Sequence, residues 1–194
     1  MGSGNLARAK KRAVAEGRTI LFVDESAFYL LPGVVRTWAP VGETPLLRCK
    51  LTRDHYSVIS AITPTGELYL AMQTEAYDSA GVIAFLEHLQ STIEGKLLII
   101  WDGATIHRSQ AIKDFLAAGA AAWLWLERLP SYAPDLNPDE GIWHYLKHVE
   151  LRNVCCHDLR QLEQEITTAV ERLLAKPEII INCFATLDDH KKTT

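Results

Sequence analysis

The stretch L-L-I-I-W-D, residues 97–102, is an apolar run that closes on an acid, Asp102. The earlier stretch T-I-L-F-V-D, residues 19–24, has the same form and closes on Asp24. Short apolar runs of this kind are typical of strands buried on both faces of a sheet. The sequence therefore predicts two buried strands, each with an aspartate at its carboxyl end.

The segments around these two runs predict the rest of a mixed α/β fold. Strands are expected at 34–38, 55–62, 67–73 and 121–126, and the turn T-P-T-G, residues 63–66, joins the middle two as a hairpin. Helices are expected at 5–17, from 78 or 79 to 95, at 109–118, 138–151 and 158–175, where apolar residues recur at helical spacing. Hairpins followed by alternating helices and strands predict a central sheet with antiparallel first strands and parallel later strands, covered by helices on both faces.

Length and composition indicate one globular domain. The chain has 194 residues and an apolar fraction of 48%, which is enough to bury a core. No apolar run is long enough to cross a membrane, and the N-terminus lacks a secretory signal, so we expect a cytoplasmic protein without a membrane partner. The net charge of −4 argues mildly against nucleic acid, although residues 5–18 and 36–53 are locally basic. Phosphate-binding, dinucleotide-binding, zinc-protease and nucleophile-elbow motifs do not occur.

The two strand-terminal acids indicate a cation site. If the strands are adjacent and parallel, Asp24 and Asp102 lie close together at the sheet edge where α/β proteins bind ligands. Close carboxylates repel, and a divalent cation relieves that repulsion. Mg²⁺ suits such oxygen ligands, and a pair of ions can activate a hydroxyl and stabilise the leaving oxygen of a phosphodiester. Either aspartate alone is also compatible with a turn or a helix cap.

A third acid, Glu140, begins a helix inside the stretch L-P-S-Y-A-P-D-L-N-P-D-E-G-I-W-H-Y-L-K, residues 129–147. Asn137 as the N-cap, Pro138 at the first helical position and Glu140 three residues after the cap fit a capping box. A carboxylate held at a helix start is also a well-placed ligand, so both roles stay open. Glu25 is expected on the opposite face of its strand, and Asp139 is expected to favour the helix dipole.

At these residues the chain resembles a known family. The segments V-D-E-S (23–26), R-T-W-A-P-V-G (36–42), W-D-G-A-T-I-H (101–107) and the 129–147 stretch together resemble the DDE transposases of bacterial insertion sequences related to the mariner superfamily. The resemblance covers residues 19–175. It implies a ribonuclease H-like fold and a triad of Asp24, Asp102 and Glu140 that holds Mg²⁺ or Mn²⁺, as two ions.

The resemblance also implies an activity and partners. Water would cut DNA at the element ends, and the freed 3′-hydroxyl would be joined to target DNA by a homodimer. His107 lies five residues after Asp102, and this spacing leaves two roles open: contact with a phosphate or a nearby carboxylate, or a surface or capping position. The candidate DNA contacts are Arg36, Arg48, Lys50, Arg53, His107 and Lys147.

Three departures from the family pattern stand out. Gly103 replaces the usual Asn after the second acid, and the spacing from Asp102 to Glu140 (140 − 102 = 38) is slightly long. The usual N-terminal helix-turn-helix DNA-binding part has no counterpart here and is expected as a separate part. We therefore expect a tag remnant and basic linker helix at 1–18, the catalytic domain at 19–176 and a C-terminal tail at 177–194. A catalytically inactive DNA-binding protein and another ribonuclease H-like nuclease remain the alternatives.

Overall fold

The computed structural model describes residues 3–31, 36, 38–43, 46, 52–130 and 134–189. Within these residues five strands form one sheet in the order β3-β2-β1-β4-β5. The strands are β1 (Thr19–Tyr29), β2 (His55–Ile62), β3 (Leu68–Gln73), β4 (Leu97–Trp101) and β5 (Leu124–Arg128).

The sheet is mixed, which confirms the predicted architecture. Strand β1 pairs antiparallel with β2, and β2 pairs antiparallel with β3. On its other side β1 pairs parallel with β4, which pairs parallel with β5. The hairpin between β2 and β3 turns at Gly66, whose φ of 94° favours glycine. Strand β1 is thus the junction between the antiparallel and the parallel halves.

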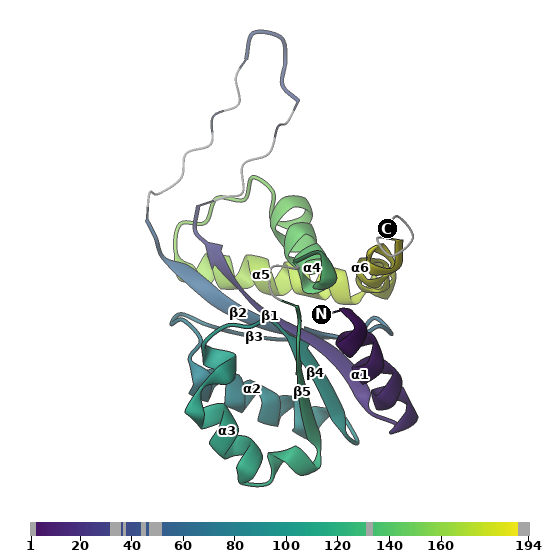
Figure 1. Ribbon diagram of the computed structural model, residues 1–194. Coiled ribbons are helices and arrows are strands. Elements are labelled where there is room, and N and C mark those ends of the chain that lie inside the picture. Colours follow the sequence, from purple (N-terminus) through teal and green to yellow (C-terminus); the bar gives the residue numbers. More distant parts are fainter. Residues whose placement is uncertain are drawn as a thin grey trace.

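Helices cover both faces of the sheet (Figure 1). Helices α2 (Ser79–Thr92) and α3 (Gln110–Ala117) lie on one face, and α1 (Ser3–Ala15), α4 (Asp139–Tyr145), α5 (Leu159–Leu174) and α6 (Pro177–Asp189) lie on the other. Side chains alternate along each strand. Leu21 and Val23 therefore pack under α2 and α3, while Phe22 packs in the core of the α4–α6 face.

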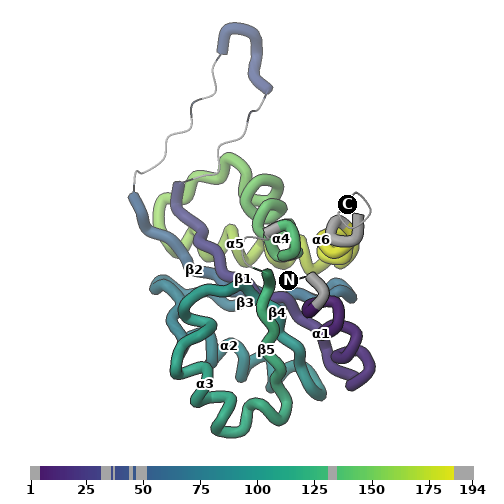
Figure 2. The backbone as a smooth tube through the Cα atoms, in the orientation of Figure 1, coloured from purple at the N-terminus to yellow at the C-terminus, as the bar shows by residue number. Residues whose placement is uncertain are grey.

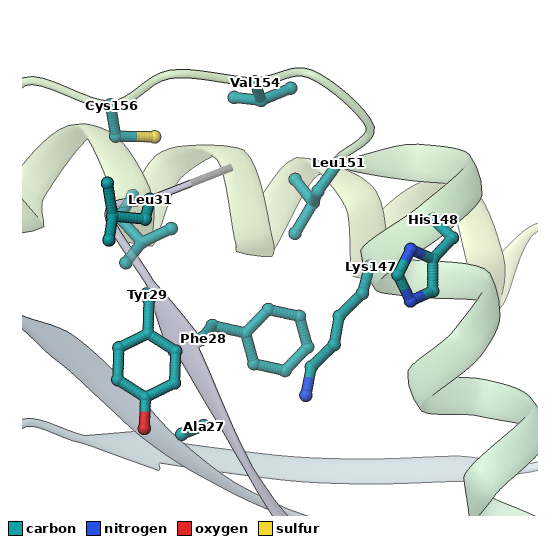
Figure 3. Close-up of a pocket in the computed structure, with 10 residues that line it drawn as sticks. Ala27, Phe28, Tyr29, Leu31, Lys147, His148, Leu151, Val154 and Cys156 are labelled. Atoms are coloured by element: carbon teal, nitrogen blue, oxygen red, sulfur yellow. The ribbon is translucent and has the colours of Figure 1, made fainter. Parts of the chain in front are cut away.

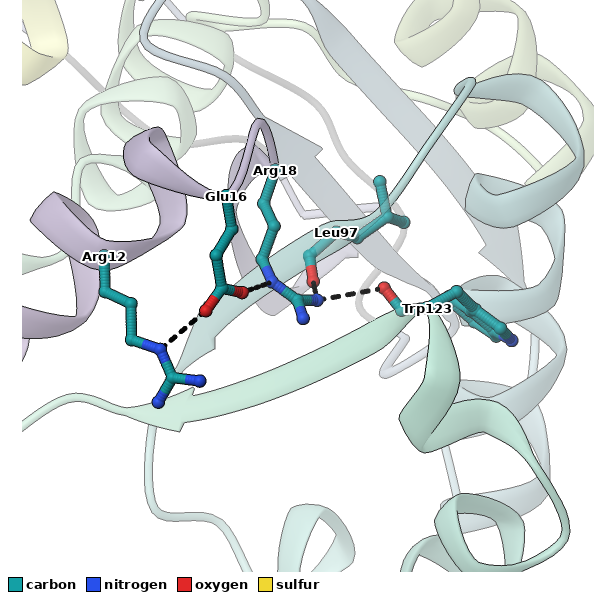
Figure 4. Close-up of polar contacts among 5 residues, drawn as sticks. All are labelled: Arg12, Glu16, Arg18, Leu97 and Trp123. Carbon is teal, nitrogen blue, oxygen red and sulfur yellow. Dashed lines mark hydrogen bonds and ion pairs between the residues drawn. The ribbon is translucent and has the colours of Figure 1, made fainter.

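Helix α1 is packed onto the domain. Its Leu6, Ala9 and Ala13 are buried. Just after it, Arg18 donates to the backbone carbonyls of Leu97 and Trp123 at 3.3 Å each, which ties the chain to the start of β4 and to the residue before β5 (Figure 4). The segment expected as a linker helix is therefore held against the sheet.

The segment expected as a C-terminal tail forms helix α6. Ile180 is fully buried, and the Phe184 ring packs edge-on against Phe22 with centroids 5.5 Å apart. Figure 2 shows that α1 and α6, the first and last helices of the chain, lie on the same side of the molecule. No helix among the described residues has the length and apolar character needed to span a membrane.

Two predicted strand boundaries are wrong: the end of β1 and the start of β5. Strand β1 does not end at Asp24 but continues to Tyr29, because residues 22–29 pair antiparallel with β2. Strand β5 begins at Leu124, since the 3₁₀ turn Ala120–Ala122 occupies the start of the predicted segment. The strand expected at 34–38 lies largely outside the described residues.

Candidate active site

Asp24 and Asp102 project from neighbouring parallel strands. The register pairs Phe22 with Ile100, and two residues further along each chain stand Asp24 and Asp102. Asp24 continues the alternation of Phe22, whose side chain lies in the core on the α4–α6 side, whereas Asp102 stands one residue beyond the end of β4. The register brings the two chain segments side by side, and the approach of the two carboxylates stays a prediction.

Asp24 is a half-buried carboxylate with a specific partner. The indole Nε1 of Trp143 donates to Asp24 Oδ2 at 2.9 Å. Burial raises the pKa of Asp24 to about 7, against the effect of this hydrogen bond, and the charges of Glu25 and Glu140 add to the increase. A cation close to this carboxyl would favour its ionised form and so lower its pKa.

The start of α4 presents two adjacent acids in different environments. Asn137 Oδ1 accepts from the backbone N–H of Asp139, the first residue of α4, at 3.2 Å, but Pro138 stands at the N-cap position, so the predicted capping box with Asn137 as N-cap is wrong. The carboxyl group of Asp139 is fully buried, whereas Glu140 is exposed. Glu140 lies close enough to Asp24 for its charge to raise the pKa of Asp24.

Asp139 is the site residue that the sequence did not reveal. Ser60, which stands opposite Asp24 in the β1–β2 pair, donates its hydroxyl to Asp139 Oδ1 at 2.6 Å. Burial raises the pKa of Asp139 well above its ordinary value, and the charges of Asp24 and Glu140 contribute. Its Oδ2 is buried without a hydrogen-bond partner among the described residues. Asp139 is therefore a buried acid whose ionised form is disfavoured at this position.

Lys147 brings a positive charge to the same face. The turn after α4 is a π-helix, Leu146–Glu150, a form often found at functional sites. From it Lys147 Nζ donates to Ser26 Oγ at 2.6 Å and lies 5.1 Å from the centroid of the Phe28 ring. Burial lowers the pKa of Lys147, and the charges of Glu140 and Asp24 oppose that effect.

A cavity of about 240 Å³ opens beside Lys147 (Figure 3). Its walls are mostly apolar and come from the end of β1, the π-helix and α5. In Figure 3 the Lys147 side chain runs alongside the Phe28 ring, with its ammonium group beside the ring.

Asp102 has its own partners on the α2–α3 side. Asp102 Oδ1 accepts from the backbone N–H of Ala104 at 2.8 Å. His107 Nδ1 lies 2.9 Å from the same oxygen, and His107 Nε2 lies 3.0 Å from Glu25 Oε1. Burial lowers the pKa of His107, but the hydrogen bond and charge of Glu25 and the charge of Asp102 outweigh it and raise the pKa. Of the two roles expected for His107, the structure shows contact with a carboxylate.

Four further basic residues were predicted to contact DNA. Arg36 and Arg53 are exposed. Arg48 and Lys50 lie outside the described residues, so their expected DNA contacts stay predictions.

The donor set fits a divalent cation by chemistry and charge. Asp24, Asp102 and Glu140 offer only oxygen, as Mg²⁺ and Mn²⁺ prefer. The raised pKa of Asp24 and the unpartnered oxygen of Asp139 indicate a surplus of acid that a cation would relieve. Within the described part of the chain no three His, Cys, Asp or Glu side chains are grouped so that together they could hold a metal ion. Mg²⁺ keeps several waters and binds through one or two carboxylates, so it does not require such a set.

Comparison with known proteins identifies the family of the chain. The family model described as DDE superfamily endonuclease matches residues 19–163, which include all three acids. None of the curated proteins matches the chain.

Several solved structures share the fold. The Mos1 strand transfer complex is 18% identical with a TM-score of 0.70, and the match covers 96% of this chain and 56% of that one. The Mos1 mariner paired end complex with Mn is 19% identical with a TM-score of 0.69, covering 96% and 57%. The catalytic domain of Mos1 mariner transposase is 18% identical with a TM-score of 0.54, covering 94% and 87%. The chain thus spans about 56% of the length of the Mos1 chain in the strand transfer complex, and the fold is ribonuclease H-like, as predicted.

Proposed function

The chain belongs to the DDE superfamily endonucleases, and we propose that it is the DNA-cutting and DNA-joining domain of a transposase. The proposal assigns it hydrolysis of phosphodiester bonds at element ends and transfer of the 3′-hydroxyl to target DNA. The observation that carries it is the parallel register that pairs Phe22 with Ile100, two residues before Asp24 and Asp102, together with Glu140 at the start of α4, whose charge acts on Asp24. The Mos1 complexes solved as a strand transfer product and with Mn support the choice of reaction and cation.

The chain's own groups have distinct roles in this proposal. Asp24, Asp102 and Glu140 would hold Mg²⁺ or Mn²⁺, as two ions. Bound there, the cations activate the attacking hydroxyl and neutralise charge on the phosphate. Trp143 occupies one oxygen of Asp24 and so fixes the direction of the other. Lys147, whose ammonium group is under the influence of the Glu140 and Asp24 charges, would bind a backbone phosphate.

Arg36, Arg48, Lys50 and Arg53 would bind DNA further from the acids. A helix-turn-helix part outside this chain would read the element ends, and two copies would pair them. These assignments extend the proposal from the site to the assembly.

Nicking of supercoiled plasmid DNA in Mn²⁺ tests the assignment. Asp24→Asn, Asp102→Asn and Glu140→Gln should each lower the nicking rate by about a hundredfold or more. The matched control is Asp139→Asn, because Asp139 is fully buried and an amide keeps its size and the acceptor for Ser60. This neighbouring variant should nick at close to the wild-type rate.

The outcomes separate the alternatives. Wild-type nicking by Glu140→Gln would make the triad assignment wrong. DNA binding without nicking in either metal would favour an inactive DNA-binding protein. Preferential cutting of branched or hybrid substrates over linear element ends would favour another nuclease of the same fold.

A further inference from the structure

Two groups behind the acids, His107 and Glu25, connect the two strands that carry Asp24 and Asp102. Glu25 follows Asp24 on β1 and points to the opposite face of the sheet, toward the hollow lined by Tyr77 and Ile106. His107 stands in the short 3₁₀ helix Ile106–Arg108, which follows Asp102. The Nε2 atom of His107 lies 3.0 Å from Glu25 Oε1.

The His107 ring is buried and held by contacts with Trp101 and Glu25. Its side chain is only 1% exposed. The ring stacks on Trp101, the residue before Asp102, with centroids 4.2 Å apart and an interplanar angle of 1°. A buried and stacked ring whose Nε2 is bonded to Glu25 has little freedom to rotate, so Nδ1 stays close to the Asp102 carboxylate.

The Asp102 carboxylate needs such support. Its side chain is 52% exposed and lies beyond the end of β4. Nδ1 of His107 lies 2.9 Å from Asp102 Oδ1 without the alignment of a hydrogen bond, so this contact is electrostatic. Together with the backbone N–H of Ala104 it engages Oδ1 and leaves Oδ2 for other partners.

We propose that His107 and Glu25 are positioning residues that orient Asp102 for metal binding, with Glu25 acting through His107. This inference rests on the proposed function, because it assigns Asp102 a cation. Groups that orient a metal ligand typically change metal affinity or activity by about 10–100-fold when they are removed. Glu25 then acts on Asp102 only through His107. Its own side chain lies on the opposite face of the sheet from Asp24, so it cannot be a ligand beside Asp24.

The test measures Mn²⁺ affinity of the DNA-free protein by electron paramagnetic resonance, together with plasmid nicking and thermal unfolding without metal. His107→Phe keeps the stacking on Trp101 but removes both nitrogen contacts, and it should weaken Mn²⁺ binding by about tenfold or more. Glu25→Gln keeps an acceptor for Nε2 without the charge and should weaken binding by less. Tyr77→Phe, at the same hollow, should bind Mn²⁺ as the wild type does.

A double-mutant cycle separates positioning from a structural role. If Glu25 acts through His107, adding Glu25→Gln to His107→Phe should cause no further loss of affinity. Additive losses of Mn²⁺ affinity in the double variant would show that Glu25 does not act through His107. Wild-type Mn²⁺ affinity in both single variants would overturn the whole inference. If His107→Phe does not fold, the isosteric Glu25→Gln decides, because wild-type affinity and nicking in that variant would equally refute it. Failure of the wild-type protein itself to bind Mn²⁺ and nick DNA would instead refute the proposed function.

Discussion

Trp143 and Asp24, 119 residues apart in the chain, are joined by a hydrogen bond in which the indole Nε1 donates to Asp24 Oδ2 at 2.9 Å. The indole is 4% exposed, and its ring packs edge-on against Phe28 with centroids 5.9 Å apart. Because Trp143 lies on α4 and Asp24 on β1, this bond fixes the helix that carries Glu140 relative to the first acid.

Replacing Trp143, the hydrogen-bond donor, should remove the link between α4 and Asp24 on β1. Trp143→Phe keeps the ring packing but removes the N–H, so we expect nicking to fall by about tenfold through the loss of an orienting bond. Trp123→Phe is the matched control, because that indole packs against Phe115 on the other face of the sheet. Equal nicking by the two variants in a plasmid assay would show that the bond does not orient Asp24.

Lys147 should contribute one phosphate contact. Lys147→Met keeps the aliphatic stem and removes the charge, so the slope of log affinity against log salt should decrease in magnitude by about one. Fluorescence anisotropy with duplex DNA at several salt concentrations measures this slope. Lys113→Met, on the exposed surface of α3, serves as the control and should leave the slope unchanged. An unchanged slope in Lys147→Met would place the ammonium group away from DNA.

Glu150 should make stability depend on pH. It accepts from Arg172 at 2.6 Å and from the Tyr145 hydroxyl at 2.9 Å, so it ties the π-helix to α5. Burial raises the pKa of Glu150, but these two hydrogen bonds and the charges of Arg172 and Lys176 outweigh it and lower the pKa below 4.5. The folded state therefore gains stability above the unfolded pKa, and loses it as the pH falls through the folded pKa.

The matching variant is Glu150→Gln, with Glu171→Gln on the exposed side of α5 as the control. At pH 7 we expect Glu150→Gln to lower the free energy of unfolding by about 1–3 kcal/mol. Urea titrations should show this difference shrinking below about pH 4.5, the ordinary pKa of the group. A difference that stayed constant down to pH 3 would contradict the assignment.

Helix α6 should be sensitive to the volume of one residue on α4. A Cβ at Gly141 would stand 2.7 Å from Cys183 Sγ, which is closer than such contacts allow. Gly141→Ala should therefore destabilise the protein by about 1–3 kcal/mol. Adding Cys183→Ala removes the sulfur and should restore most of the loss in a denaturant titration. A stable Gly141→Ala single variant would mean that α6 does not pack against α4 in this way.

The sequence predicted the elements whose signals are local. The hairpin turn at residues 63–66, the stripe of α5 and the two apolar runs were all recognisable from neighbouring residues, and the structure confirms them. Strand β1 was predicted too short because its second half, residues 25–29, is not uniformly apolar. Its extension depends on antiparallel pairing with β2, a contact that the local pattern does not contain.

The chemistry of the site was only partly predictable for the same reason. Glu140 and the two aspartates could be chosen from motifs, whereas the burial of Asp139 depends on Ser60, 79 residues earlier. Glu25 was correctly expected on the opposite face of its strand, but its link to His107 requires the fold. Helix α6 has apolar residues, Ile180 and Phe184, that could have indicated a packed helix rather than a tail.

The uninterrupted course of β1 through Asp24 makes the three acids unequal in stiffness. Asp24 is set within a paired strand, while Asp102 follows the last residue of β4 and Glu140 lies in the first turn of a helix. Backbone amides around Asp24 should therefore exchange with solvent deuterium much more slowly than those around Asp102.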